Sequence, residues 1–246
     1  MRALEALETL ELLGSTQRGL VTTAQAKVAG VSKVDLARLV EVGTLSRARH
    51  GVYVLPSAGV DPLQDLRAAW LAASASGKVV VSGASAAAVH GLGDLVPAKH
   101  EFTSGERRQS AQPDVRFRRA ELSERDVTWV DGLPATSVPR TVADLARTSL
   151  DSGHLVNVLS DAVDNPNVDV HDLERAVERY SRRYGAKSGR DLLANVAPGY
   201  LAAAFRSAVR SPGALTPSFR NQLLDVLEQP DGVNELLQLL RERTAA

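Results

Sequence analysis

Residues 20–56 read LVTTAQAKVAGVSKVDLARLVEVGTLSRARHGVYVLP, and they carry the clearest structural pattern in the N-terminal part of the chain. The first half predicts two short helices separated by a glycine, and the second half predicts a β-hairpin. A helix pair followed by a hairpin is the outline of a winged helix-turn-helix. Duplex DNA is therefore the first partner that the sequence indicates.

A capping pattern marks the start of the first helix. The segment Thr22–Gln25 matches an S/T-x-x-E/Q capping box. Gly30 can adopt the left-handed conformation that commonly ends a helix. We expect this helix to turn Val21, Ala24 and Val28 inward.

The second helix is expected to read DNA. Ser32 caps it, and Asp35 completes a second box three positions later. Leu36, Leu39 and Val40 form its apolar stripe. In helix-turn-helix docking, the second helix enters the major groove with its N-terminal residues leading. The predicted base or phosphate readers are the residues off that stripe, namely Lys33, Val34, Ala37 and Arg38.

The hairpin supplies a predicted wing. Residues 45–48 and 52–55 predict its two strands, and Arg49-His50-Gly51 predicts the turn between them. Arg47, Arg49 and His50 are expected at or near the tip, where a wing contacts the DNA backbone or the minor groove.

Local charge agrees with DNA binding. From Ser15 to Pro56, six basic residues oppose two acidic ones, so the net charge is +4. A small helical domain that contacts protein has the same outline, and this alternative stays open. The basic residues are Arg18, Lys27, Lys33, Arg38, Arg47 and Arg49.

Composition bounds the class of protein. The 246 residues suffice for two modest domains or one large one, and 44% hydrophobic content is ordinary for a soluble globular protein. A net charge of zero excludes a generally basic coat for nucleic acid. The absence of cysteine excludes disulfides and thiol catalysis and fits a cytoplasmic protein.

The N-terminal segment is expected to be a helix and not a targeting signal. MRALEALETLELLG carries three glutamates, which a signal peptide lacks. Leu4 and Leu7, with Leu10 or Glu11, are expected on its apolar face. No apolar run approaches the roughly 20 residues that span a bilayer, so no membrane partner is expected.

Beyond residue 57 the sequence predicts a second domain, residues 58–246, after a hinge at 56–62. Leu63, Leu66 and Trp70 predict a core-facing helix. The fold class is thus α+β, with a winged helix in residues 1–57 and a mixed, mostly helical C-terminal domain with a small sheet. The expected strands are 78–82, 100–103, 115–118, 127–130 and 133–136, and the expected helices are 84–90, 139–149, 152–164, 170–183, 189–195, 199–210, 216–228 and 231–243.

No catalytic or metal-binding motif is found. His100, His154 and His171 share no metal-ligand spacing, so we expect no metal and no cofactor. The serines lack a glycine elbow or a matched base, and no phosphate-binding glycine loop occurs. We therefore expect no enzyme.

Two polar features favour structural roles. His90 is expected to be a partly buried histidine that satisfies a carbonyl group. Arg140 and Asp144 lie four positions apart and are expected to pair on one helix face.

Several strings occur in an order typical of one family. GLVTTAQA, G-V-S and R-H-G-V-Y are followed by His90-Gly91-Leu92 and by DVTWVDGLPATSVPRTVADLA over Asp126–Ala146. In this order they resemble the AbiEi family of antitoxins from type IV toxin–antitoxin systems, especially its actinobacterial members. The resemblance covers residues 8 to 185.

The resemblance implies a winged helix that binds inverted repeats upstream of its own operon, either as a dimer or as a cooperative pair. It also implies a C-terminal domain that counters a toxin encoded next door, typically a nucleotidyltransferase-like protein. By position, the implied DNA-binding residues are Thr22, Thr23, Gln25, Ser32, Lys33, Val34, Ala37, Arg38, Arg47, Arg49 and His50.

Two other function classes stay open. One is a stand-alone winged-helix regulator whose C-terminal domain senses a small ligand. The other is a metal-dependent nuclease fused to a winged helix. A nuclease needs clustered acidic residues and a lysine on adjacent strands, and the sequence shows no such constellation.

A set of arginines on one expected strand also has two interpretations. Arg116 and Arg118 alternate with apolar residues and share one face of a strand. We expect a solvated sheet face balanced by glutamates, and the alternative is a basic patch that contacts DNA, RNA or an acidic toxin surface. The further members are Arg107, Arg108 and Arg119, and the balancing residues are Glu101, Glu121 and Glu124.

Overall fold

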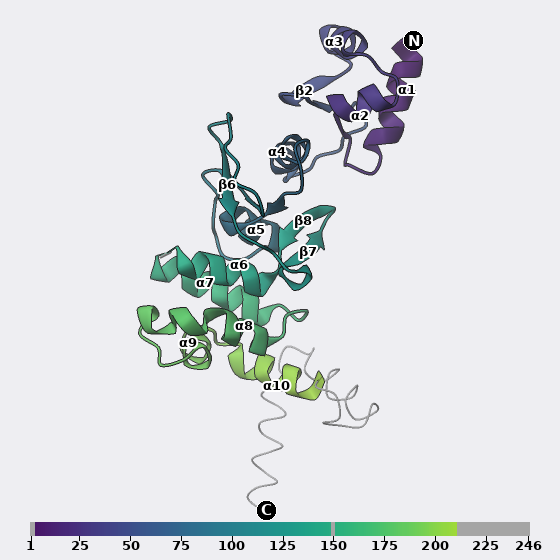
Figure 1. The fold of residues 1–246 in the computed structure, drawn as a ribbon. Helices are drawn as coiled ribbons and strands as arrows, with labels where there is room; N and C mark the ends of the chain where they lie inside the picture. The colour runs from purple at the N-terminus through teal and green to yellow at the C-terminus, as the bar shows by residue number, and fades with distance from the viewer. Residues whose placement is uncertain (1–2, 149–150, 211–246) are drawn as a thin grey trace, which may run out of the picture. The chain divides into compact units, whose positions relative to one another are not determined.

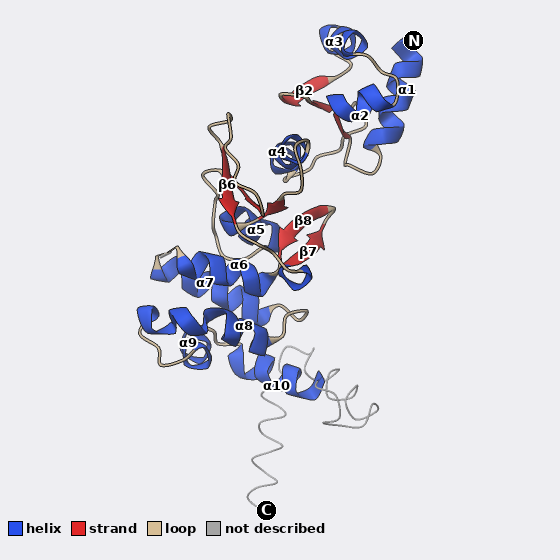
Figure 2. Cartoon of the chain, viewed as in Figure 1, coloured by secondary structure: helices blue, strands red, loops and turns tan. Residues whose placement is uncertain are grey.

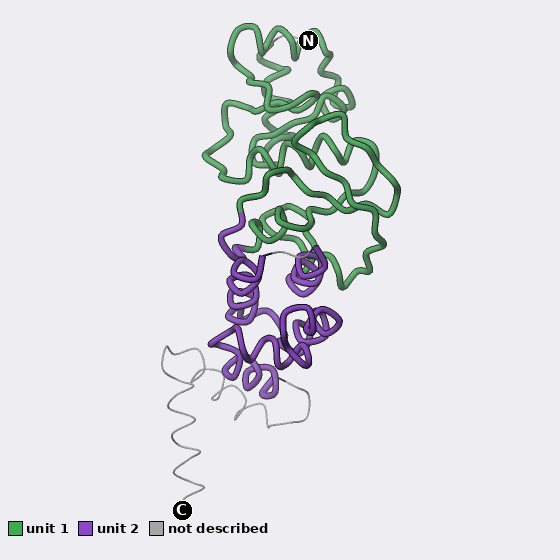
Figure 3. Tube along the Cα trace, turned by 90° about the vertical axis from the view of Figure 1, so that its left-hand side faces the viewer, with its two compact units in different colours: residues 1–90, 96–137 green, residues 91–95, 138–246 purple. Residues whose placement is uncertain are grey.

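The structure is a computed structural model that describes residues 3–148 and 151–210. The chain forms two compact units (Figure 3). The first comprises residues 1–90 and 96–137, and the second comprises Gly91–Leu95 and the chain from Val138 onward. The helices predicted at 216–228 and 231–243 lie outside the described residues.

The N-terminal part of the first unit is a winged helix, as predicted (Figure 1). The predicted hairpin is joined by a further strand that precedes the first helix of the helix-turn-helix, and the antiparallel order is β1-β3-β2. The elements in chain order are α1 (Ala3–Gly14), β1 (Leu20–Thr22), α2 (Thr23–Val28), α3 (Lys33–Glu41), β2 (Ser46–Arg49) and β3 (Val52–Val54).

Both predicted capping boxes are present. The Gln25 amide donates to Thr22 Oγ1 at 3.2 Å, and the Thr22 amide donates to Gln25 Oε1 at 2.9 Å. Ser32 and Asp35 make the equivalent pair of bonds at the start of α3. Gly30 has a φ of 84°, the left-handed conformation that the predicted helix end required.

Of the three residues predicted to turn inward at α2, Val21 is fully buried, but the prediction is wrong for Ala24 and Val28. Val28 is 91% exposed and Ala24 is exposed as well, whereas Ala26 is fully buried. The helix has only six residues, most of them small, so its hydrophobic pattern does not define a direction.

The predicted face of α1 is also wrong in part. Leu4 is 66% exposed, and the buried positions are Ala6, Leu10 and Gly14. A Cβ at Gly14 would lie 2.2 Å from Leu55 Cδ1, so the small residues let the helix approach its neighbours closely. A pattern that follows only the leucines misses this stripe.

Helix α4 (Gln64–Ser74) packs between two sheets. Ala68 and Leu71 contact the winged-helix sheet through Leu20 and Val52, all in one apolar cluster. The other face of that sheet packs against α1, α2 and α3. The remaining apolar residues of α4, among them Leu66, enter the core of the second sheet.

The predicted small sheet is present and is mixed, with the order β6-β5-β4-β8-β7. Strands β5 and β6 are parallel, as are β4 and β8, and the other two pairings are antiparallel. Asp131 and Gly132 both have positive φ, 49° and 76°, and form the tight turn between β7 and β8. The elements are β4 (Val80–Val81), α5 (Gly83–His90), β5 (His100–Ser104), β6 (Val115–Arg119), η1 (Glu124–Asp126), β7 (Val127–Val130) and β8 (Leu133–Thr136).

The described part of the second unit is helical throughout (Figure 2). The segment predicted as one helix at 170–183 is an α-helix that continues as a 3₁₀ helix. No helix within residues 3–148 and 151–210 is long and apolar enough to cross a membrane. The elements are α6 (Val138–Arg147), α7 (Ser152–Asp164), α8 (Val170–Val177), η2 (Glu178–Tyr184), α9 (Gly189–Val196) and α10 (Tyr200–Arg210).

Glu174 links the last three helices of the described chain. Its carboxylate accepts hydrogen bonds from the Tyr200 hydroxyl at 2.5 Å and from Arg190 Nε at 3.4 Å, and it lies 3.1 Å from His171 Nδ1. Burial, together with the bond to Glu174, raises the pKa of Tyr200 to about 12. The cluster therefore holds α8, α9 and α10 together as a polar core.

The α+β fold class is confirmed, but the first compact unit does not end at the predicted hinge. Residues 56–62 lead into α4, which shares its apolar side chains with the sheets on both sides. The winged helix and the second sheet therefore belong to one unit.

Replacing Leu71 with alanine tests the role of α4. Leu71 is 7% exposed, so we expect Leu71→Ala to lower the free energy of unfolding by about 2–5 kcal/mol, measured by urea denaturation. The matched control is Leu12→Ala on α1, where leucine is 77% exposed and a change within about 0.5 kcal/mol is expected. Equal losses in the two variants would contradict the packing of α4.

Candidate nucleic-acid interface

The predicted reading face of α3 is exposed. Leu36 and Leu39 are buried in the winged-helix core and fix the rotation of the helix. The four side chains on the opposite side are all exposed, and Val34 is 67% exposed. They are Lys33, Val34, Ala37 and Arg38. This face can therefore enter a major groove.

The polar side chains at the N-termini of α2 and α3 make hydrogen bonds within the protein. Thr22 and Gln25 bond to each other, and Gln25 Nε2 also donates to Gln17 Oε1 at 3.0 Å. Thr23 Oγ1 donates to the Gly51 carbonyl at 3.3 Å, and Ser32 bonds to Asp35. These side chains shape the motif and join α2 to the wing turn, and their predicted contact with DNA stays a prediction.

Two of the three predicted wing residues are exposed. The Arg47 guanidinium lies 5.7 Å from the centre of the Tyr53 ring, and His50 is exposed at the turn between β2 and β3. Both side chains can reach a DNA backbone or a minor groove.

Arg49 is a correction to the predicted set. Its side chain is 9% exposed, and its guanidinium lies 2.8 Å from Asp65 Oδ1 and 2.7 Å from Asp114 Oδ2. It also donates to Gln112 Oε1 at 3.0 Å. The buried guanidinium binds protein carboxylates in this structure and is not presented to a phosphate.

A β-bulge explains why Arg49 turns away. Regular alternation along a strand would put Arg47 and Arg49 on the same face. The register instead shifts between them, so Arg47 lies opposite Tyr53 and Arg49 lies opposite Val52. Tyr53 belongs to the core with α1–α3, whereas Val52 belongs to the cluster with α4.

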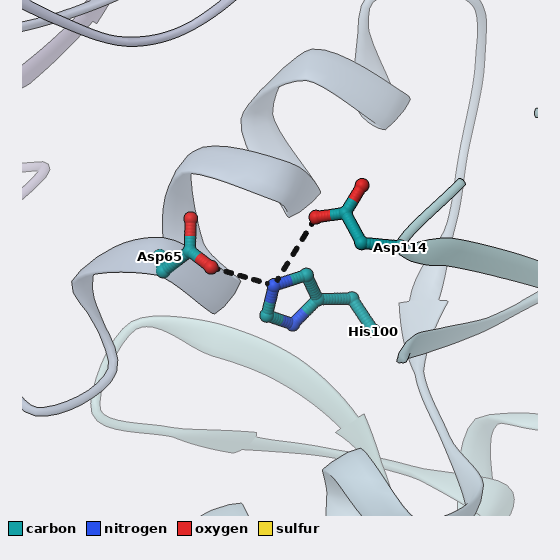
Figure 4. Close-up of side chains that lie close together, drawn as sticks. All are labelled: Asp65, His100 and Asp114. Carbon is teal, nitrogen blue, oxygen red and sulfur yellow. Dashed lines mark hydrogen bonds and ion pairs between the residues drawn. The ribbon is translucent and has the colours of Figure 1, made fainter. Parts of the chain in front are cut away.

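Two partners of Arg49, Asp65 and Asp114, form an Asp–His–Asp cluster with His100 (Figure 4). His100 Nε2 lies 2.9 Å from Asp65 Oδ2 and 3.9 Å from Asp114 Oδ2. One ligand atom from each residue lies within 4.8 Å of the others, a donor set of the kind that holds a divalent cation. Arg49 already bridges the two carboxylates, so the positive charge at this site comes from the protein itself.

The hydrogen bond from Arg49 lowers the pKa of Asp114 below its ordinary value. Burial opposes the charge on Arg49, but the bonds to Asp114 and Asp65 raise the pKa of its guanidinium. The ion pairs are therefore formed throughout the neutral pH range. We call Arg49, Asp65, His100, Gln112 and Asp114 the Arg49 cluster.

A second group of charges also joins the winged helix to the rest of the unit. The Arg67 side chain on α4 is 3% exposed and lies 3.0 Å from Asp61 Oδ2 and 3.1 Å from Asp131 Oδ2. Asp131 also pairs with Arg18, which lies before β1. Burial would raise the pKa of Asp61, but bonds from the Leu63 amide and Arg67 hold it below its ordinary value.

These ion pairs reduce the positive charge that the winged helix can offer to DNA. Of the six basic residues between Ser15 and Pro56, Arg18 and Arg49 pair with carboxylates outside the winged helix. The remaining four are exposed, and they are Lys27, Lys33, Arg38 and Arg47. The candidate interface is therefore α3 and the exposed wing residues Arg47 and His50.

The sequence gives a weak signal for Arg67 and none for the Arg49 cluster. Arg67 lies four positions after Leu63, on the apolar stripe of the predicted helix, and an arginine there indicates a buried ion pair. Asp65, His100 and Asp114 come from three distant segments, so only the fold brings them together.

Other predicted polar contacts are confirmed. His90 Nε2 lies 2.7 Å from the Thr136 carbonyl oxygen, and the side chain is half-buried. Arg140 Nε donates to Asp144 Oδ2 at 3.2 Å. Both interactions are structural.

The arginines around β6 contact the protein itself. Arg116 pairs with Glu101 at 3.4 Å, and Arg119 Nε donates to the Gly105 carbonyl. Arg108 donates to the carbonyls of Ala73 and Ser76 at the end of α4. These bonds favour the interpretation as a sheet face over a nucleic-acid patch.

A hollow of about 560 Å³ lies beside the second sheet. The buried Thr103 hydroxyl has no hydrogen-bond partner in the described structure, and Trp129, which is 67% exposed, also lines the hollow. Lys78 and Glu121 place opposite charges on the walls. The hollow therefore does not select a ligand of either charge.

Two family models match the chain in tandem. Residues 8–56 match the model described as transcriptional regulator, AbiEi antitoxin, and residues 79–195 match the AbiEi antitoxin C-terminal domain. The chain belongs to the AbiEi antitoxin family. It is thus an antitoxin with a transcriptional-regulator domain, and the reading face described above lies within that domain.

The search of solved structures found similar chains. One is the RV2827C protein from Mycobacterium tuberculosis, with 21% identity, 80% of each chain covered and a TM-score of 0.48. No curated protein matched significantly. Helix α4 lies between the two matched AbiEi segments and joins them physically.

The half-buried position of His90 predicts a pH effect on stability. Burial lowers the pKa of His90 below its ordinary 6.5, although the bond to Thr136 opposes the shift. The unfolded chain therefore binds the proton first as the pH falls below 6.5, and the free energy of unfolding decreases. We expect His90→Gln, which keeps a donor for the carbonyl, to reduce this loss between about pH 7 and pH 5. An unchanged difference between the two pH values in urea denaturation would contradict the assignment.

Proposed function

We propose that the protein represses its own operon by binding inverted repeats in the promoter and counters a nucleotidyltransferase-like toxin encoded beside it. The observation that carries the DNA-binding part is the exposed face of α3, which presents Lys33 and Arg38 together within a matched transcriptional-regulator domain. The family match carries the antitoxin part.

Docking on DNA begins with electrostatic attraction. Lys27, Lys33, Arg38 and Arg47 are exposed and attract the phosphate backbone, although the whole chain has a net charge of zero. Helix α3 then enters the major groove, and Arg47 and His50 on the wing reach the backbone or the minor groove. An inverted repeat requires two copies of the domain at matched half-sites.

Antitoxin activity is assigned to the part of the chain outside the winged helix. Residues 151–246 carry eleven basic and thirteen acidic residues, so this region favours protein contacts over DNA. We propose that it acts without catalysis, through its effect on the toxin or on the toxin's target.

The hollow beside the second sheet favours a second candidate function, a winged-helix regulator that senses a small ligand. Its volume of about 560 Å³ lies within the range of small-molecule sites, about 300–1,000 Å³. This alternative requires no toxin gene.

The DNA-binding part is tested with Arg38→Ala in a titration against operator DNA. If Arg38 reads a base, we expect the affinity to fall by roughly 1–3 kcal/mol on one operator sequence and less on unrelated DNA. If Lys33 contacts phosphate, Lys33→Ala is expected to lower the log–log salt slope by about 0.9 on any DNA.

The matched control for both variants is Arg175→Ala, which removes an exposed arginine of the second unit. We expect it to leave both the affinity and the salt slope unchanged. Equal losses in Arg38→Ala and Arg175→Ala would remove α3 from the interface.

The antitoxin part is tested by growth of a host that expresses the neighbouring gene. The full chain is used because removal of the winged helix would expose the α4 residues Ala68 and Leu71. We expect the wild type and the DNA-binding variant Arg38→Ala/Arg47→Ala to rescue growth equally. Rescue by the wild type alone would show that neutralisation requires DNA binding, and absence of toxicity would favour the regulator.

A further inference from the structure

We propose that Asp114 and Asp65 act through Arg49 as positioning residues for the wing, so that two carboxylates strengthen the binding of a polyanion. This inference rests on the proposed DNA binding. It assigns a role in DNA recognition to residues that lie outside the segment matched by the regulator model, residues 8–56.

The Arg49 cluster attaches the wing to two other segments of the first unit. Arg49 lies on β2, next to His50 at the turn and two positions after Arg47. Its carboxylate partners are Asp65 in the first turn of α4 and Asp114 in the loop before β6, and His100 at the start of β5 contacts both of these carboxylates. The guanidinium is 9% exposed and binds Asp65, Asp114 and Gln112 at 2.7–3.0 Å. Its planar geometry then restricts both the position and the rotation of β2.

Because of the bulge, the bonds of Arg49 also affect the positions of the wing residues Arg47 and His50. Because the register shifts between Arg47 and Arg49, Arg47 lies on the same face as Tyr53 and stays exposed, whereas Arg49 points to α4. Loss of the Arg49 bonds would leave the bulge without its anchor. The short hairpin that carries Arg47 and His50 would then sample several positions. Because DNA binding would have to order it, the loss of conformational entropy would lower the affinity.

Electrostatic repulsion alone predicts the opposite effect of these carboxylates on the affinity for DNA. Asp65 is 70% exposed and Asp114 is 43% exposed, so both carboxylates repel a nearby phosphate backbone. Removing one of them would reduce the repulsion and free Arg49 for a phosphate. A simple charge effect therefore predicts tighter binding by Asp114→Asn, and positioning predicts weaker binding.

The experiment measures the affinity of the full chain for a duplex that carries the inverted repeat upstream of its own gene. We expect Asp114→Asn, Asp65→Asn and Arg49→Ala each to weaken binding by roughly threefold to a hundredfold, the range of couplings between neighbouring residues. The double variant Arg49→Ala/Asp114→Asn is expected to bind no more weakly than Arg49→Ala alone.

Two further readouts separate positioning from direct contact. Arg49→Ala is expected to leave the salt slope unchanged, because Arg49 contacts no phosphate, whereas Arg47→Ala lowers it by about 0.9 if Arg47 contacts one. In the free protein, the amides of Ser46–Val54 are expected to exchange hydrogen faster in Asp114→Asn and Asp65→Asn than in the wild type. The matched control is Asp172→Asn, which removes an exposed carboxylate of the second unit.

Tighter binding by Asp114→Asn, or a salt slope lowered by Arg49→Ala, would overturn the proposal. If the wild type does not bind the duplex, the proposed repressor function fails, and the role in DNA binding fails with it. Hydrogen exchange of the free protein then still shows whether the carboxylates hold the wing. Unchanged exchange in both aspartate variants would overturn that part as well.

Discussion

The burial of α4 between two sheets is the constraint on which the architecture of the first unit depends. Ala68 and Leu71 cover the winged-helix sheet, and Leu66 and Ala69 enter the core of the second sheet. A helix of eleven residues with apolar side chains on both sides cannot leave either sheet without exposing them to water. The winged helix and the second sheet are therefore held together by apolar burial. The ion pairs of Arg49 and Arg67 on either side also restrict how the two can be oriented.

Those charged groups explain why a protein of zero net charge presents a basic face in one place. Arg18 and Arg49 neutralise carboxylates at the junction, while Lys33, Arg38 and Arg47 stay exposed. All five lie in one basic segment of the sequence. The arginines that pair across the junction are distinguished by their carboxylate partners, and not by their neighbours along the chain.

Local features of this chain could be predicted from sequence, and long-range ones could not. The capping boxes at Thr22 and Ser32 and the turn at Asp131 depend on residues within four positions of each other. The role of Arg49 depends on a bulge that the alternation of β2 conceals and on an aspartate 65 positions away. The inward face of α1 depends on the fit of Gly14 against Leu55, which hydrophobicity does not encode.

If α4 joins the winged helix to the second sheet, the two tumble as one body, and ¹⁵N relaxation of the full chain measures this. We expect one rotational correlation time for the amides of β1–β3 and those of β4–β8, with fast internal motion confined to loops. A clearly shorter correlation time for residues 20–54 would show a winged helix that moves on a flexible hinge, and α4 would then not hold the two sheets together.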